Sequence, residues 1–137
     1  MDKNNFEEIL TTNARYYGVV ENNMPNGPGT MTFNDGEIHK GRFVNGKLHG
    51  YGTQIGGKDK PGWTYTGDFV NGIKHGHGKE SNGDGSHYKG AWENNLPHGQ
   101  GEVSFDDGQK ETGLYSQGKL IDGYITKPDG RIVKAKS

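Results

Sequence analysis

Histidine is the residue type in this sequence that supports the most kinds of chemistry, because it can ligate metals and transfer protons near neutral pH. His49, His75 and His98 recur at nearly regular spacing, each followed by Gly-x-Gly. On successive hairpins of one sheet, such positions would lie two strands, or roughly 10 Å, apart. A metal ion needs its donors within about 2.1 Å, so these histidines cannot share one. A loose site at His75 and His77, with His87 near them, is the alternative. We expect each periodic ring to bind the backbone of a turn, and we predict no metal site.

Other catalytic or cofactor chemistry lacks its sequence signals. Gly-x-Gly pairs such as Gly76-x-Gly78 lack the third glycine of a dinucleotide fingerprint, and Gly-Lys-Ser/Thr does not occur. The adjacent carboxylates Asp106 and Asp107 fall in a predicted turn, where no desolvation would raise a pKa. No cysteine is present, which excludes a thiol nucleophile, a thiolate metal site and disulfides. We therefore expect a protein that is not an enzyme and needs no cofactor.

Composition indicates a folded protein with a thin, aromatic-rich core. The 137 residues suit one ordinary domain, and the formal net charge of −1 argues against nucleic-acid binding, which favours basic proteins. The aromatic residues recur at fixed spacing, a feature that disordered chains lack. No apolar run approaches the ~20 residues that cross a bilayer, and the N-terminus lacks a signal-peptide core. A cytoplasmic location is expected.

The glycines and aromatic residues belong to a repeat. The template aromatic-x-Gly-x-aromatic, followed by His-Gly-x-Gly, occurs from Tyr65 and Tyr88, and from His39 with histidine in the first place. Copies from Tyr16 and Glu111 are degenerate, as end units with one neighbour usually are. The chain thus divides into an N-terminal segment 1–15, a repeat domain 16–133 with repeats starting near 16, 39, 65, 88 and 111, and a basic tail 134–137.

Each repeat predicts a β-hairpin. Tyr88, Gly90 and Trp92 are two residues apart, so they share one face of a strand, and the glycine leaves room for an aromatic ring from the adjoining strand. Asn-Gly or Asn-Asn then supplies a tight turn with positive φ, and Asp-Gly returns the chain to the next unit. Five hairpins in series predict an all-β fold: a single-layer, twisted antiparallel meander of about ten strands.

The N-terminal segment is expected to contain a short helix. Phe6, Ile9 and Leu10 are spaced at i, i+3 and i+4, and the asparagines ahead of them can cap a helix. Such a helix is too short to persist alone in water, so we expect it to dock on the sheet.

The template resembles the one that defines MORN repeats, and the resemblance covers residues 16–133. It implies an elongated single-layer sheet of β-hairpins whose aromatic groove holds partner peptides or helices. Members of the family occur in cilia and flagella, in cytoskeletal rings, in junctional membrane complexes and ahead of catalytic domains. These 137 residues include no such catalytic domain, so the resemblance does not extend to the enzymatic members.

The aromatic rows are the candidate binding site. In a single layer, a face packed only on itself would stay partly wet, and exposed aromatic side chains are usual in binding hot spots. Alternatively, the rings only stack to hold the sheet together. We expect a non-catalytic scaffold that binds a helix or peptide of a larger cytoskeletal, ciliary, flagellar or other intracellular assembly. Trp92→Ala should then abolish binding and leave the sheet folded. The predicted partner-binding residues are Phe43, Trp63, Tyr65, Phe69, Tyr88, Trp92, Phe105 and Tyr115.

Two further expectations concern the C-terminal end and the edges of the sheet. Lys127, Arg131, Lys134 and Lys136 either keep the last edge strand soluble or attract anionic phospholipid, at roughly 1 kcal/mol per basic residue. The second role defines the alternative function, a peripheral membrane module. The exposed end strands of an open sheet can also pair two copies into a homodimer.

Overall fold

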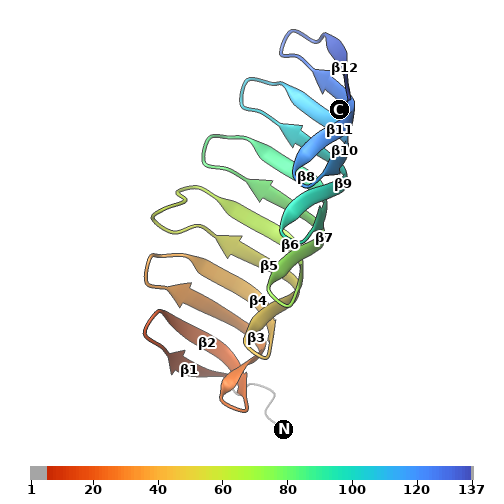
Figure 1. The fold of residues 1–137 in the computed structure, drawn as a ribbon. Helices are drawn as coiled ribbons and strands as arrows, with labels where there is room; N and C mark the ends of the chain where they lie inside the picture. Colours follow the sequence, from red (N-terminus) through yellow and green to blue (C-terminus); the bar gives the residue numbers. More distant parts are fainter. Residues whose placement is uncertain (1–5, 137) are drawn as a thin grey trace.

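The computed structural model describes residues 6–136 as one antiparallel sheet of twelve strands (Figure 1). The strands lie in chain order, so each pairs with its sequence neighbours and none crosses over. They are β1 (Phe6–Leu10), β2 (Ala14–Glu21), β3 (Met24–Phe33), β4 (Ile38–Val44), β5 (Lys47–Ile55), β6 (Thr64–Val70), β7 (Ile73–Ser81), β8 (His87–Glu93), β9 (Leu96–Ser104), β10 (Lys110–Ser116), β11 (Lys119–Thr126) and β12 (Ile132–Lys136). Strands β2–β11 form the five predicted hairpins.

The prediction of an N-terminal helix is wrong. Phe6–Leu10 form an outer strand, β1, which pairs with Arg15–Val19 of β2. Five residues make little more than one helical turn, whereas an extended segment can share backbone hydrogen bonds with β2. The ring of Phe6 also packs against that of Tyr17, with centroids 5.5 Å apart. The asparagines that we expected to cap the helix lie outside the described residues.

Both predicted kinds of turn are present. Within repeats, the tight turns place two residues at positive φ, as at Asn45 (49°) and Gly46 (86°), which is the backbone of a type I′ hairpin. Between repeats, the Asp84 Oδ1 accepts a hydrogen bond of 2.9 Å from the backbone N–H of Ser86, while Gly85 takes a φ of 92°. The same carboxylate-to-backbone bond recurs at Asp35, Asp107 and Asp129.

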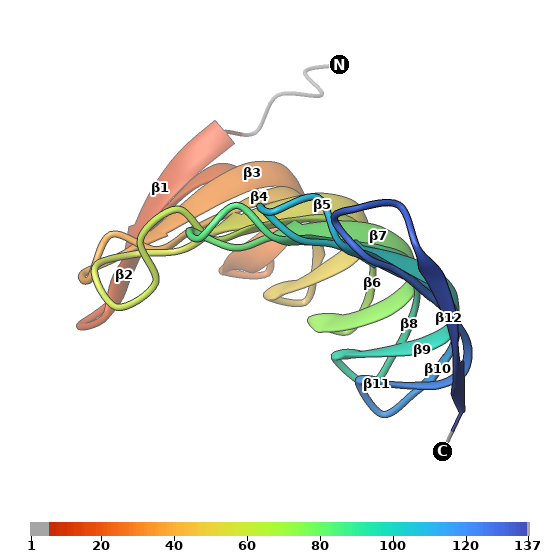
Figure 2. The same ribbon diagram turned by 90° about the horizontal axis from the view of Figure 1, so that it is seen from above.

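The sheet is curved, with a concave and a convex side (Figure 2). Trp63 immediately precedes β6, and Lys74 pairs with Phe69 near the other end of that strand. Six residues of flat strand span roughly 20 Å, yet the Lys74 Nζ lies 5.0 Å from the centre of a Trp63 ring. The strand must bend for these side chains to meet. We call this concave side the groove.

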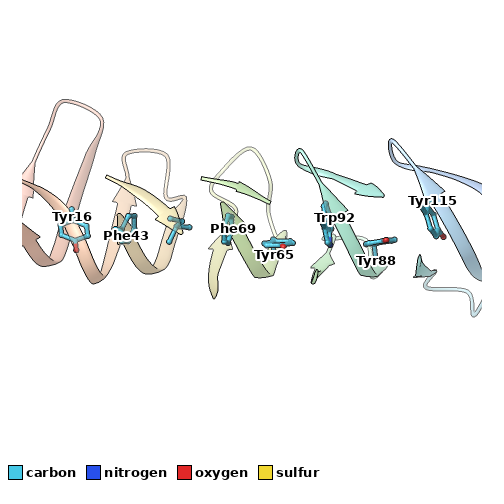
Figure 3. Packing of buried hydrophobic residues seen from close by; sticks show 8 residues of the cluster. Tyr16, Phe43, Tyr65, Phe69, Tyr88, Trp92 and Tyr115 are labelled. Carbon is cyan, nitrogen blue, oxygen red and sulfur yellow. The ribbon is translucent and has the colours of Figure 1, made fainter. Parts of the chain in front are cut away.

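The core is one line of side chains along the groove (Figure 3). The rings meet edge to face, as in Tyr65–Trp92 and Tyr88–Trp92, whose centroids lie 5.1 and 5.3 Å apart, a preferred geometry for aromatic pairs. We call the line the aromatic row. It consists of Tyr16, Phe43, Leu48, Tyr65, Phe69, Tyr88, Trp92 and Tyr115.

A line of glycines crosses the sheet on the groove face, and we call it the glycine row. Each strand from β2 to β11 contributes one glycine, and each glycine stands opposite the next, from Gly18 to Gly123. The row ends at Glu7 on β1 and at Ala135 on β12. The glycine row therefore provides a common register for all twelve strands.

The glycine row makes room for tyrosine rings. A methyl group at Gly78 would overlap the ring of Tyr65, and a methyl group at Gly101 would overlap that of Tyr88. Tyr16 lies over Gly29 in the same way. This packing confirms the prediction that the glycines admit an aromatic ring from the adjoining strand.

Candidate functional site

The structure buries most of the predicted partner-binding residues. Six of the eight are at most 3% exposed: Phe43, Tyr65, Phe69, Tyr88, Trp92 and Tyr115. The premise that this face stays partly wet is therefore wrong for these six side chains. Bending of the strands brings rings of neighbouring repeats edge to face, which closes the row against water. These six residues form the structural floor of the groove.

The two remaining predicted residues are more accessible. Trp63 is half-buried, and its Nε1 donates a hydrogen bond of 2.6 Å to the Glu80 carboxylate. Phe105 follows the last residue of β9 and is 37% exposed. Trp63 thus lies at the margin of the aromatic row, whereas Phe105 lies in a loop between repeats.

The buried tyrosine hydroxyls bind backbone carbonyls. The Tyr65 hydroxyl donates to the carbonyl of Asp68 at 3.0 Å, and the Tyr88 hydroxyl donates to that of Ala91 at 2.9 Å. Burial raises the pKa of Tyr88 to about 12, and burial is also the main cause that raises the pKa of Tyr16, Tyr65 and Tyr115. These groups stay neutral at physiological pH, so they act as hydrogen-bond donors and not as catalytic bases.

Two of the three periodic histidines bind turns, as predicted. The His49 Nδ1 accepts a hydrogen bond from the backbone N–H of Asn71 at 3.2 Å, and His98 Nδ1 accepts one from Gln117 at 3.3 Å. In each case the bond reaches the tight turn of the next repeat. The ring therefore links the tight turn of one hairpin to the preceding hairpin.

The third repeat makes this link without its histidine. The Asn95 side-chain oxygen accepts a hydrogen bond of 2.9 Å from the backbone N–H of Lys74, and the Asn95 backbone N–H donates to the Lys74 carbonyl. His75 and His77 are exposed. Within residues 6–136, no cluster of three or more His, Cys, Asp or Glu side chains is arranged to hold a metal ion.

The groove keeps an open hollow of about 330 Å³ at the second repeat. Here His39 stands where three other repeats have tyrosine. Its ring packs on Phe33 at 4.8 Å, and its Nε2 lies 2.7 Å from the Glu37 carboxylate. Leu48, not a tyrosine ring, lies over the local glycine pair. The main side chains that line the hollow are Met31, Phe33, His39, Phe43, Leu48 and Gln54.

Lys74 breaks the repeat pattern in the third repeat, one repeat further along the groove from the hollow. The other four repeats place an apolar residue at the equivalent point: Pro25, Leu48, Pro97 and Leu120. The Lys74 Nζ lies 5.0 to 5.3 Å from rings of Trp63, Tyr65 and Trp92. Desolvation lowers its pKa, and the Glu80 carboxylate, which Trp63 already binds, only partly opposes this effect. Among the described residues no carboxylate lies within 4.0 Å of this ammonium.

Comparison with known families accounts for the repeated architecture. Four segments, residues 16–38, 39–58, 65–87 and 88–110, match the family described as MORN repeat, and together they cover more than half of the chain. The chain belongs to the MORN-repeat family. A search of curated proteins found no match. Strands β10 and β11 lie mostly beyond the matched segments but form a fifth hairpin of the MORN sheet.

The convex side of the MORN sheet carries a second, shallower site. A hollow of about 310 Å³ has the backbone of Gly67, Gly78 and Gly90 as its floor. Lys79 and Lys89 stand directly opposite each other at its side, which places two like charges together. The groove offers a partner more apolar side chains, so the groove is the stronger candidate site.

Two of the four predicted lipid-binding residues form ion pairs within the sheet. Arg131 lies 2.9 Å from the Asp129 carboxylate, and Lys134 lies 2.7 Å from that of Asp122. Lys134 lowers the pKa of Asp122 through a hydrogen bond and its charge. These ion pairs offset part of the positive charge that anionic lipid would meet. No helix in residues 6–136 has the length and apolar character to cross a membrane.

Proposed function

We propose that this MORN sheet is a non-catalytic protein-interaction scaffold whose groove binds a helix or extended peptide of a partner protein. The hollow at the second repeat carries the proposal. It presents the half-buried side chains of Met31 and Phe33 to a partner's apolar side chain, over a floor of Phe43 and Leu48. Burial of one such side chain is worth about 1.5–3 kcal/mol, which suits an interface anchor.

Lys74 specifies the chemistry of the partner. Leu48 and Lys74 occupy equivalent positions in consecutive repeats, roughly 10 Å apart. A half-buried ammonium costs desolvation energy, and a residue that breaks a local rule often serves function. A partner carboxylate would offset that cost. The partner segment is therefore acidic and carries a large apolar residue for the hollow.

The predicted contact residues take different roles in this proposal. The six buried ones support the groove, as Tyr65 and Trp92 do beneath Lys74. Trp63 and Phe105 retain exposed surface for direct contact. The family resemblance suggests a cytoskeletal, ciliary or flagellar assembly and a cytoplasmic location, and we include that setting in the proposal.

Selection from a random peptide display library on the immobilised protein tests this function. We expect peptides that combine acidic residues with Trp, Phe or Leu, and that bind in the groove as mapped by NMR shifts at Leu48. Calorimetry then compares the chain with Lys74→Leu, Lys74→Arg and the convex-face control Lys89→Leu. Truncation of a desolvated charge pair costs ~2–5 kcal/mol, so Lys74→Leu should weaken binding at least tenfold.

The controls separate the outcomes. Lys74→Arg keeps the charge and should retain most of the affinity, and Lys89→Leu should leave it unchanged. Failure to recover any groove-binding peptide would contradict the scaffold function. If vesicles with phosphatidylserine bind the protein in place of peptides, and Lys127, Arg131, Lys134 and Lys136 are needed for it, the membrane module replaces the scaffold. If groove-binding peptides bind Lys74→Leu with unchanged affinity, the acidic character of the partner is refuted and the scaffold function is not.

A further inference from the structure

The two outermost strands of the described sheet complement each other. β1 has the sequence Phe-Glu-Glu-Ile-Leu, and β12 has Ile-Val-Lys-Ala-Lys. Among residues 6–136, β1 pairs only with β2 and β12 pairs only with β11. An open edge offers unpaired backbone groups to another strand. One edge is acidic and the other is basic, so a second copy of this chain fits both.

The glycine row fixes how such a pair would align. On β12 the row ends at Ala135, opposite Gly123, and on β1 it ends at Glu7, opposite Gly18. Placing Glu7 of a second copy opposite Ala135 continues the row across the junction. The meander has twelve strands, so β12 and the next β1 then run antiparallel, like every other pair in the sheet. The aligned pairs are Phe6–Lys136, Glu7–Ala135, Glu8–Lys134, Ile9–Val133 and Leu10–Ile132.

This alignment matches side chains on both faces, although only the glycine row was used to choose it. On the convex face Glu8, which lies 3.7 Å from Arg15 in its own chain, meets Lys134, which lies 2.7 Å from Asp122. The junction therefore joins two ion pairs into one cluster of alternating charges. Leu10 and Ile132, which are 70% and 67% exposed, also face each other there. In the groove Ile9, which packs on the aromatic row, meets Val133 and lengthens the apolar line.

We propose that copies of this chain associate head to tail, with β12 of one copy pairing onto β1 of the next. If the predicted edge-to-edge homodimer had a twofold axis, it would instead pair β1 with β1 or β12 with β12. Either arrangement brings like charges onto adjacent strands, which is unfavourable. A heterologous contact of this kind does not close on itself unless the rotation forms a ring, so it produces open chains of the sheet.

Charge exchange tests the interface. Sedimentation velocity across a range of concentrations should show species larger than the monomer for the 137-residue chain. Glu8→Lys and Lys134→Glu should each reduce association at least tenfold, because each variant places like charges at the junction. An equimolar mixture of the two variants should restore assembly, because every junction between unlike chains regains an opposite pair. Circular dichroism must show that both variants keep their strand content.

Each other result would overturn the proposal. A chain that stays monomeric at all concentrations does not associate. Assembly that neither substitution weakens does not use this junction. If the single variants lose assembly and the mixture does not restore it, the substitutions have disturbed the packing of β1 or β12. The charge pair between copies is then not the cause.

Crosslinking distinguishes head-to-tail pairing from twofold pairing. The chain contains no cysteine, so a chain with Glu7→Cys and a second chain with Ala135→Cys each carry a single thiol. Directly opposed Cβ atoms lie about 4.5–5.5 Å apart, close to the separation in a disulfide. Mild oxidation of the mixture should give mainly the heterodimer. A preponderance of disulfide-linked dimers between two Glu7→Cys chains, or between two Ala135→Cys chains, would contradict the proposal.

Discussion

The side chain of Trp92 shows how single residues in the groove act as a core. It is 3% exposed, its ring meets Tyr65 and Tyr88 edge to face, and its Nε1 donates to the Gly78 carbonyl at 3.0 Å. We expect Trp92→Ala to lower the free energy of unfolding by about 3–5 kcal/mol, so this variant cannot serve as a clean binding test. Urea denaturation followed by circular dichroism measures it.

Tyr51→Ala on the convex face is the matched control for Trp92→Ala. Tyr51 is 69% exposed, and substitutions at such sites usually change stability by less than about 0.5 kcal/mol. If Trp92→Ala were as mild as Tyr51→Ala, the aromatic row would not carry the stability of the sheet, and the prediction of a tolerant binding surface would stand.

We expect Lys74 to be the opposite case, a residue that lowers the stability of the fold. Lys74→Leu restores the apolar type found at this position in other repeats, such as Leu48 and Leu120. Removal of a desolvated ammonium should raise the free energy of unfolding by about 0.5–2 kcal/mol, as measured by the urea midpoint. A destabilised variant would show instead that attraction of the ammonium to Trp63, Tyr65 and Trp92 outweighs its desolvation.

At the scale of strands, the fit between tyrosine and glycine decides how closely two strands of a repeat pack. A methyl group at Gly78 would overlap the Tyr65 ring, whereas at Gly52 the nearest atoms are the Lys40 carbonyl at 3.0 Å and Leu48 at 3.3 Å. We expect Gly78→Ala to cost about 1–3 kcal/mol through overpacking, and Gly52→Ala to cost less. Thermal unfolding of the two variants measures the difference, and equal costs would refute the role of the ring.

The strands and turns could be predicted from sequence because their causes are local. Asn45-Gly46 favours positive φ wherever it occurs, and alternate residues share a face of any strand. The bend of the sheet depends on contacts between distant side chains, such as Lys74 with Trp63, and the burial of the aromatic row follows from it. The spacing of residues in the sequence reveals neither the bend nor the burial. The apolar residues of β1 fit a helix as well as a strand, and only pairing with β2 decides between them.

The candidate site could have been found in the sequence by aligning the repeats with one another. His39 replaces tyrosine and opens the hollow, and Lys74 replaces proline or leucine. Both are departures from the pattern, whereas most of the predicted binding residues conform to it. In a repeat protein, conforming residues build the shared scaffold, so departures from the pattern are the better guide to a site found in one repeat only.

At the scale of the whole molecule, the two proposed interactions use separate surfaces, the groove and the edges. The groove faces one side of the sheet, and the strands β1 and β12 lie at its two ends (Figure 1). Head-to-tail pairing would leave every groove open and would align successive grooves along one chain. A scaffold built in this way presents several partner sites in series without any additional domain.

The buried tyrosines make the stability of the entire sheet sensitive to alkaline pH. Burial raises the pKa of Tyr88 to about 12 and raises that of Tyr16, Tyr65 and Tyr115 from the ordinary value of 10.0. Above about pH 10 these tyrosines therefore hold fewer protons in the unfolded state than in the folded state, so their contribution to stability is fully present below pH 10 and falls as the pH rises toward 12. Circular dichroism, with absorbance of ionised tyrosine at each pH, should show loss of strands together with ionisation. Tyr88→Phe removes one of these groups and should make the decline less steep, and an unchanged slope would contradict the assignment.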